Sequence, residues 1–285
     1  MTAAAGMLAN RPRIGFRDRL RSLADRYLLF AYTGLAVIYL LLPVAIIILF
    51  SFNKPLGRRN FVWQQFSLDA WLHPFAVPGL GSSVELSLII AFLSTLIATA
   101  LGTLMALALV RYGFRGKGLS NSLIFLPMAT PEIVMGASLL TLYVSIGHPP
   151  FFPLNLVTIL VAHILFNISY VVVTVRARLV GFPQHLEEAA MDLGANEWHT
   201  FWRVTFPLIL PGIIAAALLA FSLSIDDFVI TNFSAGRTQT FPMFIYAQAK
   251  VGVPVQVYVI GSIIFLVAVL SVGLTTVAGR RTARS

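Results

Sequence analysis

The sequence lacks cysteine entirely and is poor in charged residues. Without cysteine, the chain can form neither disulfide bonds nor thiolate metal sites. Charged residues make up 11% of the 285 residues, whereas a soluble globular domain has about 25%. So few charges cannot cover a water-exposed surface, and 58% of the residues are hydrophobic. The composition therefore predicts an integral membrane protein whose solvent is the lipid bilayer.

The chain also lacks the motifs of an enzyme. A P-loop requires Gly-x-x-x-x-Gly-Lys followed by Ser or Thr, and the nearest segment, 113–118, has the wrong spacing and no hydroxyl residue after Lys117. No Ser/His/Asp arrangement indicates covalent catalysis, and the five histidines show no ligand spacing. We therefore expect no catalytic residue, no metal site and no cofactor in this chain. Nor does the net charge of +9 indicate nucleic-acid binding, because the basic residues lie in short segments between apolar runs.

Six apolar stretches are long enough to cross a bilayer, since a membrane-spanning helix needs about 20 mostly apolar residues. They cover approximately residues 27–52, 82–110, 119–146, 156–175, 207–233 and 255–278. The first is too long for the apolar core of a cleaved signal peptide, and we interpret it as a retained span. The third contains internal prolines, which break or kink a helix. The sequence thus predicts an all-α membrane protein of six transmembrane helices.

The distribution of Lys and Arg predicts the orientation, because short cytoplasmic loops of membrane proteins are enriched in both. Fifteen of the twenty lie in the first 26 residues, in the loops after the second and fourth stretches, and in the C-terminal tail. Both termini are therefore expected in the cytoplasm. We divide the chain into a basic N-terminal arm (1–26), a transmembrane domain (27–278) with a long cytoplasmic loop (176–206), and a cytoplasmic tail (279–285).

The cytoplasmic loop has the pattern of a helix, a glycine and a second helix. Its first part favours a short helix, with Glu187 and Glu188 near the N-terminus, where the helix dipole favours negative charge. Gly194 is expected to end this helix, because glycine readily adopts a positive φ. Small alanines give the helix a face that suits a groove on a partner protein. An interfacial helix packed against the bilayer fits the pattern equally well.

Four acidic residues fall within or at the ends of the apolar stretches: Glu85, Glu132, Asp226 and Asp227. Carboxylates are costly in hydrocarbon and usually face a cavity or a substrate path. At about 1.5 Å per residue, Asp226 lies roughly 28 Å from the start of the fifth stretch, in the outer half of the membrane. Glu85 also fits a plain first-turn carboxylate, and Glu132, which follows a Thr-Pro pair, fits the cap of a half-helix in a broken span.

The two aspartates cannot point the same way on an unbroken helix, because neighbouring residues are about 100° apart around its axis. One is expected to face the substrate pathway, while the other bonds to backbone or solvent. Carboxylates around an outer cavity favour a cationic substrate, on which nearby aromatic rings can stack. The candidate rings are Tyr143, Phe228, Phe233 and Tyr246. The fifth stretch also carries small residues at four-residue spacing that suit close helix packing: Gly212, Ala216, Ala220 and Ser224.

The loop resembles the EAA loop of binding-protein-dependent ABC importer permeases. The match consists of Glu188-Ala189-Ala190, three intervening residues, Gly194, nine intervening residues, and Val204-x-Phe206-Pro207, where the family pattern ends in Ile-x-Leu-Pro. The resemblance implies the type I importer permease fold, and it implies that Glu188, Ala189, Ala190 and Gly194 dock on a separate ATPase subunit, which binds ATP and Mg. We place Glu187 in the same coupling segment.

A second resemblance narrows the family to permeases of spermidine/putrescine importers. It is carried by residues 222–233, by Gly236, by Thr240-Phe241-Pro242 with Ile245-Tyr246, by 49–53, and by the Pro-Glu pair at Pro131-Glu132. It implies a bacterial inner-membrane subunit that pairs with a second permease, two ATPase copies and an extracytoplasmic binding protein. Opine-like or other amine cargoes, and a non-transport scaffold that docks a cytoplasmic partner, remain alternatives. A secondary transporter would need ionisable groups at the membrane midplane.

Overall fold

The computed structural model describes residues 16–57, 59–181 and 185–282, and these residues fold almost entirely into helices. The one β-pairing within this part of the chain is an isolated bridge between Asn53 and Phe66. The all-α prediction is therefore confirmed. The chain divides into two compact units, Met1–Pro74 with Pro254–Ser285, and Phe75–Val253.

The first unit contains two long helices, α1 (Phe16–Phe50) and α12 (Val255–Thr282), and the short α2 (Asp69–Leu72). No residue of the apolar part of α1, Tyr27–Phe50, is buried inside the chain and most are exposed, as expected of a helix that faces lipid or another subunit. Residues 1–15 of the predicted arm (1–26) lie outside the described residues. The rest of the arm belongs to α1, which begins at Phe16. Near α2, the ring of Phe52 stacks on Trp71 at 5.1 Å between centroids.

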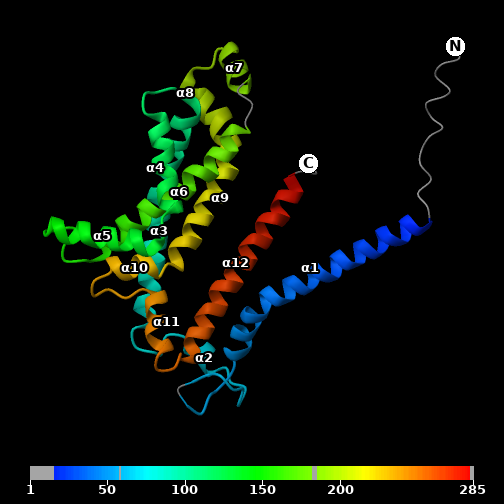
Figure 1. The fold of residues 1–285 in the computed structure, drawn as a ribbon, viewed down its shortest axis with the longest axis vertical. Helices are drawn as coiled ribbons and strands as arrows, with labels where there is room; N and C mark the ends of the chain where they lie inside the picture. The colour runs from blue at the N-terminus through cyan, green and yellow to red at the C-terminus, as the bar shows by residue number, and fades with distance from the viewer. Residues whose placement is uncertain (1–15, 58, 182–184, 283–285) are drawn as a thin grey trace. The chain divides into compact units, whose positions relative to one another are not determined.

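The second unit is built around three helices that lie side by side: α3 (Leu80–Arg111), α6 (Leu156–Val180) and α9 (Phe206–Ile225) (Figure 1). Small residues make this close approach possible. A Cβ added at Gly102 of α3 would lie 2.6 Å from the Val171 side chain of α6. The predicted stripe on the fifth stretch is confirmed, since Ala216 and Ala220 are fully buried.

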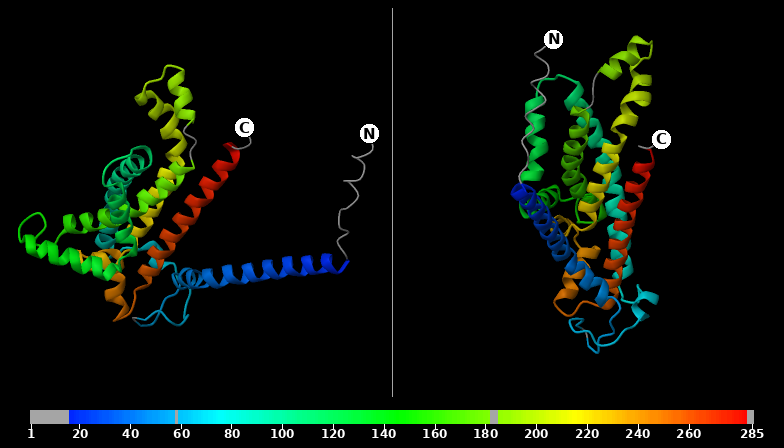
Figure 2. Two further views of the ribbon diagram at one scale, coloured as in Figure 1. Left: turned by 45° about the horizontal axis from the view of Figure 1, so that its top comes forward. Right: turned by 90° about the vertical axis from the view of Figure 1, so that its right-hand side faces the viewer.

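The third predicted span is broken, as the internal prolines indicated. It forms α4 (Lys117–Ala129) and α5 (Glu132–Ile146), which meet at an angle of 108°. The break falls at Thr130 and Pro131, because proline disfavours helical backbone at the residue before it. Figure 2 shows α5 running across the bundle instead of continuing along α4.

The fifth span ends earlier than predicted. We expected a helix to residue 233, but α9 stops at Ile225, and a separate short helix, α10 (Val229–Ser234), follows. The break lies at Asp226 and Asp227, so the geometry of an unbroken helix, from which different directions were expected for the two side chains, does not apply here. After α10 comes α11 (Phe241–Ala249), and both lie toward the end of the bundle opposite to the cytoplasmic loop (Figures 1 and 2).

The number of spans and their orientation remain predictions. Four helices are long and apolar enough to cross a membrane, or five if α4 and α5 count as one broken span. The last predicted span lies within α12, whose segment Val255–Leu270 is apolar.

Candidate functional site

Asp226 and Asp227 occupy the break between α9 and α10 but have different surroundings. Asp226 caps the end of α9 and is exposed. The Asp227 side chain is 5% exposed. Its carboxylate accepts hydrogen bonds from the backbone N–H of Thr231 at 2.8 Å and of Ile230 at 3.3 Å, and from the Thr231 hydroxyl at 2.7 Å. Asp227 therefore holds the first turn of α10, and Asp226 is the carboxylate left open to a ligand.

A buried polar chain continues inward from Asp227. It consists of Asp227, Thr231, His163, Ser224 and Ser94. His163 Nε2 lies 2.8 Å from the Thr231 hydroxyl, and His163 Nδ1 lies 2.6 Å from the Ser224 hydroxyl. The Ser224 and Ser94 hydroxyls are 2.9 Å apart. These residues come from α3, α6, α9 and α10, so the chain ties four helices together.

Sequence reasoning missed this chain. It found no Ser/His/Asp arrangement, whereas the structure brings Ser224, His163 and Asp227 together. His163 is 3% and Ser224 4% exposed, and the Ser224 oxygen is also within hydrogen-bond distance of Ser94. A nucleophile must reach its substrate. We therefore interpret the arrangement as structural.

Glu132 lies at the start of α5 and is exposed. Helix α5 packs on α10, and a Cβ added at Gly136 would lie 2.5 Å from the Phe233 ring. This packing places the break in the third span, which Glu132 follows, near the break that carries Asp226 and Asp227. Glu85 is exposed on the first turns of α3, and no contact joins it to these carboxylates within the described residues.

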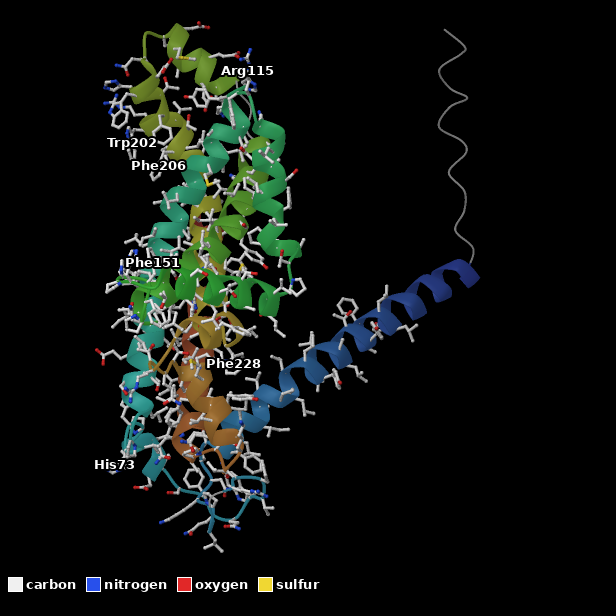
Figure 3. All side chains as sticks on the ribbon, turned by 60° about the vertical axis from the view of Figure 1, so that its left-hand side comes forward. His73, Arg115, Phe151, Trp202, Phe206 and Phe228 are labelled. Carbon is white, nitrogen blue, oxygen red and sulfur yellow. The ribbon has the colours of Figure 1, made fainter. Side chains whose placement is uncertain are left out.

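The candidate aromatic residues divide into exposed and buried ones. Phe228 is half-buried and packs on Tyr246 of α11 at 4.6 Å between ring centroids; Figure 3 marks Phe228. The Lys250 ammonium lies 5.1 Å from the centre of the Tyr246 ring. Tyr143, by contrast, is 1% exposed, donates its hydroxyl proton to the Thr158 carbonyl at 3.0 Å and stacks on Phe151. Tyr143 therefore packs α5 against α6 and presents no open ring face.

The loop that was predicted to be cytoplasmic folds into a helix, a glycine turn and a second helix, as expected. Helix α7 (His185–Asp192) is followed by Gly194 at φ +92° and by α8 (Glu197–Thr200), whose first turn is capped by Asn196. Glu188 and Ala189 are exposed and Ala190 is half-buried. The Leu193 side chain is 90% exposed, although it is apolar. This apolar, solvent-facing end of the unit is the kind of surface that a partner protein covers.

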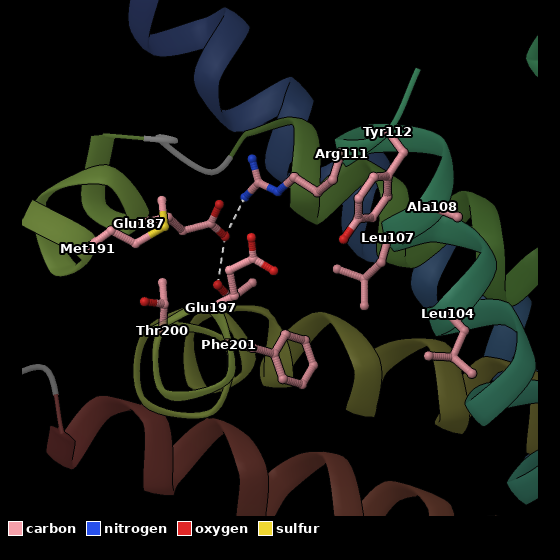
Figure 4. A pocket seen from close by; sticks show the side chains of 11 residues that line it. Leu104, Leu107, Ala108, Arg111, Tyr112, Glu187, Met191, Glu197, Thr200 and Phe201 are labelled. Carbon is pink, nitrogen blue, oxygen red and sulfur yellow. Dashed lines mark hydrogen bonds and ion pairs between the residues drawn. The ribbon is translucent and has the colours of Figure 1, made fainter. Parts of the chain in front are cut away.

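Glu187 differs from its neighbours because it points back into the protein (Figure 4). Its Oε1 accepts hydrogen bonds from Arg111 Nη2 at 2.8 Å and from the Thr205 hydroxyl at 2.6 Å. The Arg111 and Glu187 side chains are 14% and 19% exposed. They border a cavity of about 460 Å³ between α3 and the loop, lined also by Met191, Glu197 and Phe201. Glu187 thus fixes α7 to the ends of α3 and α9.

We expect this ion pair to couple the loop to the bundle. Glu187→Gln and Arg111→Gln should each weaken ATP-driven transport, and the double variant should be little worse than either single one, because charged groups in contact act as a unit. Hydrogen bonds to charged groups contribute about 1.5–3 kcal/mol, so the coupling energy should reach about 1 kcal/mol after screening. A double-mutant cycle on transport rate measures it, with the exposed Glu188→Gln as the comparison. Additive losses would contradict the coupling.

Helix α8 joins α9 without a gap, through a π-helical turn at Phe201–Thr205. The Phe206 N–H bonds to the Phe201 carbonyl, five residues earlier. Pro207, which follows, has no N–H and would crowd the carbonyl four residues before it, and a widened turn relieves that crowding. Figure 3 shows Trp202 and Phe206 at this junction. The fifth span therefore does not start at residue 207 but continues a helix that begins at Glu197.

Comparison with known proteins identifies the class. Residues 98–284 match the family described as the binding-protein-dependent transport system inner membrane component. The match covers more than half of the chain, and the chain belongs to this family. It is an inner-membrane permease subunit of the type I ABC importer class.

Two groups of relatives, named PotC and PotI, match most of the chain. The spermidine/putrescine transport system permease protein PotC of Haemophilus influenzae is 34% identical over 252 residues, 88% of this chain and 96% of the relative. PotC of Escherichia coli K12 is 37% identical over 235 residues, 82% of this chain and 87% of the relative. The putrescine permease PotI of the same strain is 36% identical over 230 residues, 79% and 81% of the two chains.

Solved structures share the fold at lower identity. A chain of a bacterial ABC transporter that imports the acidic polysaccharide alginate is 18% identical, with a TM-score of 0.66 over 93% of this chain and 99% of that one. A chain of an amino acid ABC transporter is 19% identical, with a TM-score of 0.55 over 76% and 100% of the two chains. At these identities the likeness supports the fold and not the cargo.

Proposed function

We propose that this permease subunit carries polyamines, spermidine or putrescine, into the cell. The observation that carries the proposal is the exposed Asp226 carboxylate, held at a helix break next to the α5–α10 packing that also brings in Glu132. Negative charge at a membrane-embedded break favours a cationic cargo, and breaks in spans are where transporters bind substrates. The names of the PotC and PotI relatives support the same cargo.

The aromatic pair Phe228 and Tyr246 supplies a second surface for such a cargo. A primary ammonium group, that of Lys250, already lies over the Tyr246 ring. An ammonium of the cargo is expected to bind a ring face of this pair by the same cation–π attraction, which contributes about 0.5–1 kcal/mol at exposed sites. Such weak contacts suit a permease, since a tightly held cation would not leave the site.

The partners in this proposal are a second homologous permease, two copies of an ATPase and an extracytoplasmic binding protein. One structural neighbour of this fold is an alginate transporter in complex with an alginate-bound periplasmic protein. In this chain, Glu188, Ala189, Ala190 and Gly194 would contact the ATPase, which binds ATP and Mg and performs hydrolysis. Closure of the ATPase dimer would move α7. The hydrogen bond that the Thr205 hydroxyl donates to Glu187 would transmit that motion to α9.

Reconstitution tests the proposal. In liposomes that contain the chain with its partner subunits, labelled spermidine should accumulate only when ATP and loaded binding protein are present. The exposed Asp226 contributes about 1 kcal/mol at most after solvent screening, so Asp226→Asn should lower the maximal uptake rate about fivefold. Glu85→Gln, a carboxylate outside the group, is the matched control.

Four outcomes contradict the proposal. Uptake driven by an ion gradient without ATP would assign the chain to another transporter class. Full inhibition by an opine, with none by unlabelled putrescine, would assign another cargo. Normal uptake by Asp226→Asn would remove the carboxylate from the pathway. A complete absence of uptake for any amine, with the loop still binding the ATPase, would favour a docking scaffold.

A further inference from the structure

We propose that His163 and Thr231 are positioning residues for cargo, which hold the break between α9 and α10 in one conformation and so fix where the Asp226 carboxylate points. The proposal rests on the proposed function, because it assigns its effect to Asp226. It concerns side chains that lie outside the pathway, in the buried polar chain of Asp227, Thr231, His163, Ser224 and Ser94.

The first argument is the position of His163 across the break. Its Nδ1 contacts Ser224, two residues before Asp226 on α9, at 2.6 Å. Its Nε2 contacts Thr231, on the first turn of α10, at 2.8 Å. The histidine comes from α6, which is continuous through this region. His163 therefore fastens the two sides of the break to a third helix, and residues 225–230 between them have little freedom to rearrange.

The second argument is that the hydrogen bonds form one connected series. The Thr231 hydroxyl donates to the Asp227 carboxylate, so it accepts from His163 Nε2–H. His163 Nδ1 and the Ser224 hydroxyl share the next hydrogen bond, and the Ser224 and Ser94 hydroxyls share the one after it. The Ser94 hydroxyl also lies 3.3 Å from the Ala91 carbonyl of its own helix. The proton at Nε2 is assigned from the partners, as histidine protons must be. Loss of one member leaves a buried polar group without its partner.

The third argument is that stability alone does not require these groups. Buried polar and ionic networks are often no more stable than apolar packing of the same volume. Their benefit is that they specify one arrangement, because a misplaced polar group in a low-dielectric interior is costly. Here the network specifies the conformation of the break that carries Asp226. A cargo would meet the break in that one conformation.

Thr231→Val tests the proposal, because it removes both hydroxyl contacts and nearly preserves the side-chain shape. Maximal spermidine uptake in the reconstituted complex should fall by the same factor as in Asp226→Asn, about fivefold. Thr231→Ser, which retains the hydroxyl, should restore most of the rate. Thr141→Val is the matched control, since Thr141 is exposed on α5 and bonds within its own helix.

The double variant Asp226→Asn with Thr231→Val decides between positioning and a general structural role. If Thr231 acts through Asp226, the double variant should transport no more slowly than either single one. Multiplied losses, about 25-fold, would overturn the proposal. So would normal uptake by Thr231→Val when Asp226→Asn is impaired, whereas normal uptake by Asp226→Asn itself would instead refute the proposed function.

A second variant covers the case in which Thr231→Val does not accumulate in the membrane. Ser224→Ala removes the contact of His163 on the other side of the break and changes the volume by a single oxygen atom. It should give the same loss of uptake and the same lack of additivity with Asp226→Asn. An additive loss in this variant would also overturn the proposal.

Discussion

Replacement of Gly194 by proline is expected to abolish ATP-driven uptake while the chain still assembles with its partners. The φ angle at Gly194 is +92°, and a proline ring fixes φ near −65°. Proline also removes the N–H that Gly194 donates to the Met191 carbonyl at 2.9 Å. The turn between α7 and α8 cannot form with this residue, so α7 loses the orientation in which it presents its exposed face.

Gly194→Ala refines this prediction. A Cβ at this position meets nothing within 4 Å, so the alanine adds no steric clash and only the cost of a positive φ, about 1–2 kcal/mol. Uptake should therefore lie between that of the native protein and that of the proline variant. Gly118→Ala is the control, because it adds the same atom in open space where φ is not positive. Uptake and ATPase stimulation are measured on purified complex; native rates in Gly194→Pro would contradict the docking role.

Asp227→Leu is expected to prevent the chain from accumulating in a folded form, whereas Asp226→Leu leaves the fold intact. Loss of the Asp227 carboxylate removes the acceptor of two backbone N–H groups and of the Thr231 hydroxyl, and it leaves His163 without the nearby negative charge. Removal of one partner from a buried charged network costs about 3–5 kcal/mol, which is much of the stability of a typical domain.

The two neighbouring aspartates are matched controls for one another. They differ by one position in the chain, and only Asp227 is buried. Yield and thermal stability of the detergent-solubilised chain measure the fold, while uptake measures the pathway. We expect Asp227→Leu to fail in the first assay and Asp226→Leu in the second. Equal stability of the two variants would show that the hydrogen bonds of Asp227 contribute little.

Local patterns in the sequence predicted the parts of the molecule that depend on neighbours in the chain. The apolar stretches, the break at the Thr-Pro pair before Glu132, the helix–glycine–helix loop and the small-residue stripe on α9 all follow from residues close in sequence. The end of the fifth span was wrong by eight residues, because 226–233 is as apolar as a continuing helix apart from its aspartates. Only the packing of α10 shows that the helix stops.

The assignment of roles to the acids needed contacts between distant segments. Sequence alone treated Asp226 and Asp227 as a pair and left their directions open. His163 and Ser94, which belong to the buried hydrogen-bond chain of Asp227, lie 64 and 133 residues from Asp227 in the sequence. The same holds for Glu187, whose partner Arg111 is 76 residues away. For Tyr143 the sequence predicted a place in the substrate pathway. Its side chain is buried in the interior instead.

The helix that begins at Glu197 and ends at Ile225 has a consequence for how this chain can vary. It joins the docking loop to the residue before Asp226 without interruption. Insertion of one residue anywhere along it would turn one end against the other by about 100° and shift it by about 1.5 Å. Either Glu187 would lose its hydrogen bond with Thr205, or the Asp226 side chain would turn away from Glu132. The orientations of the two ends are therefore coupled through the length of this helix, and related permeases should keep that length constant.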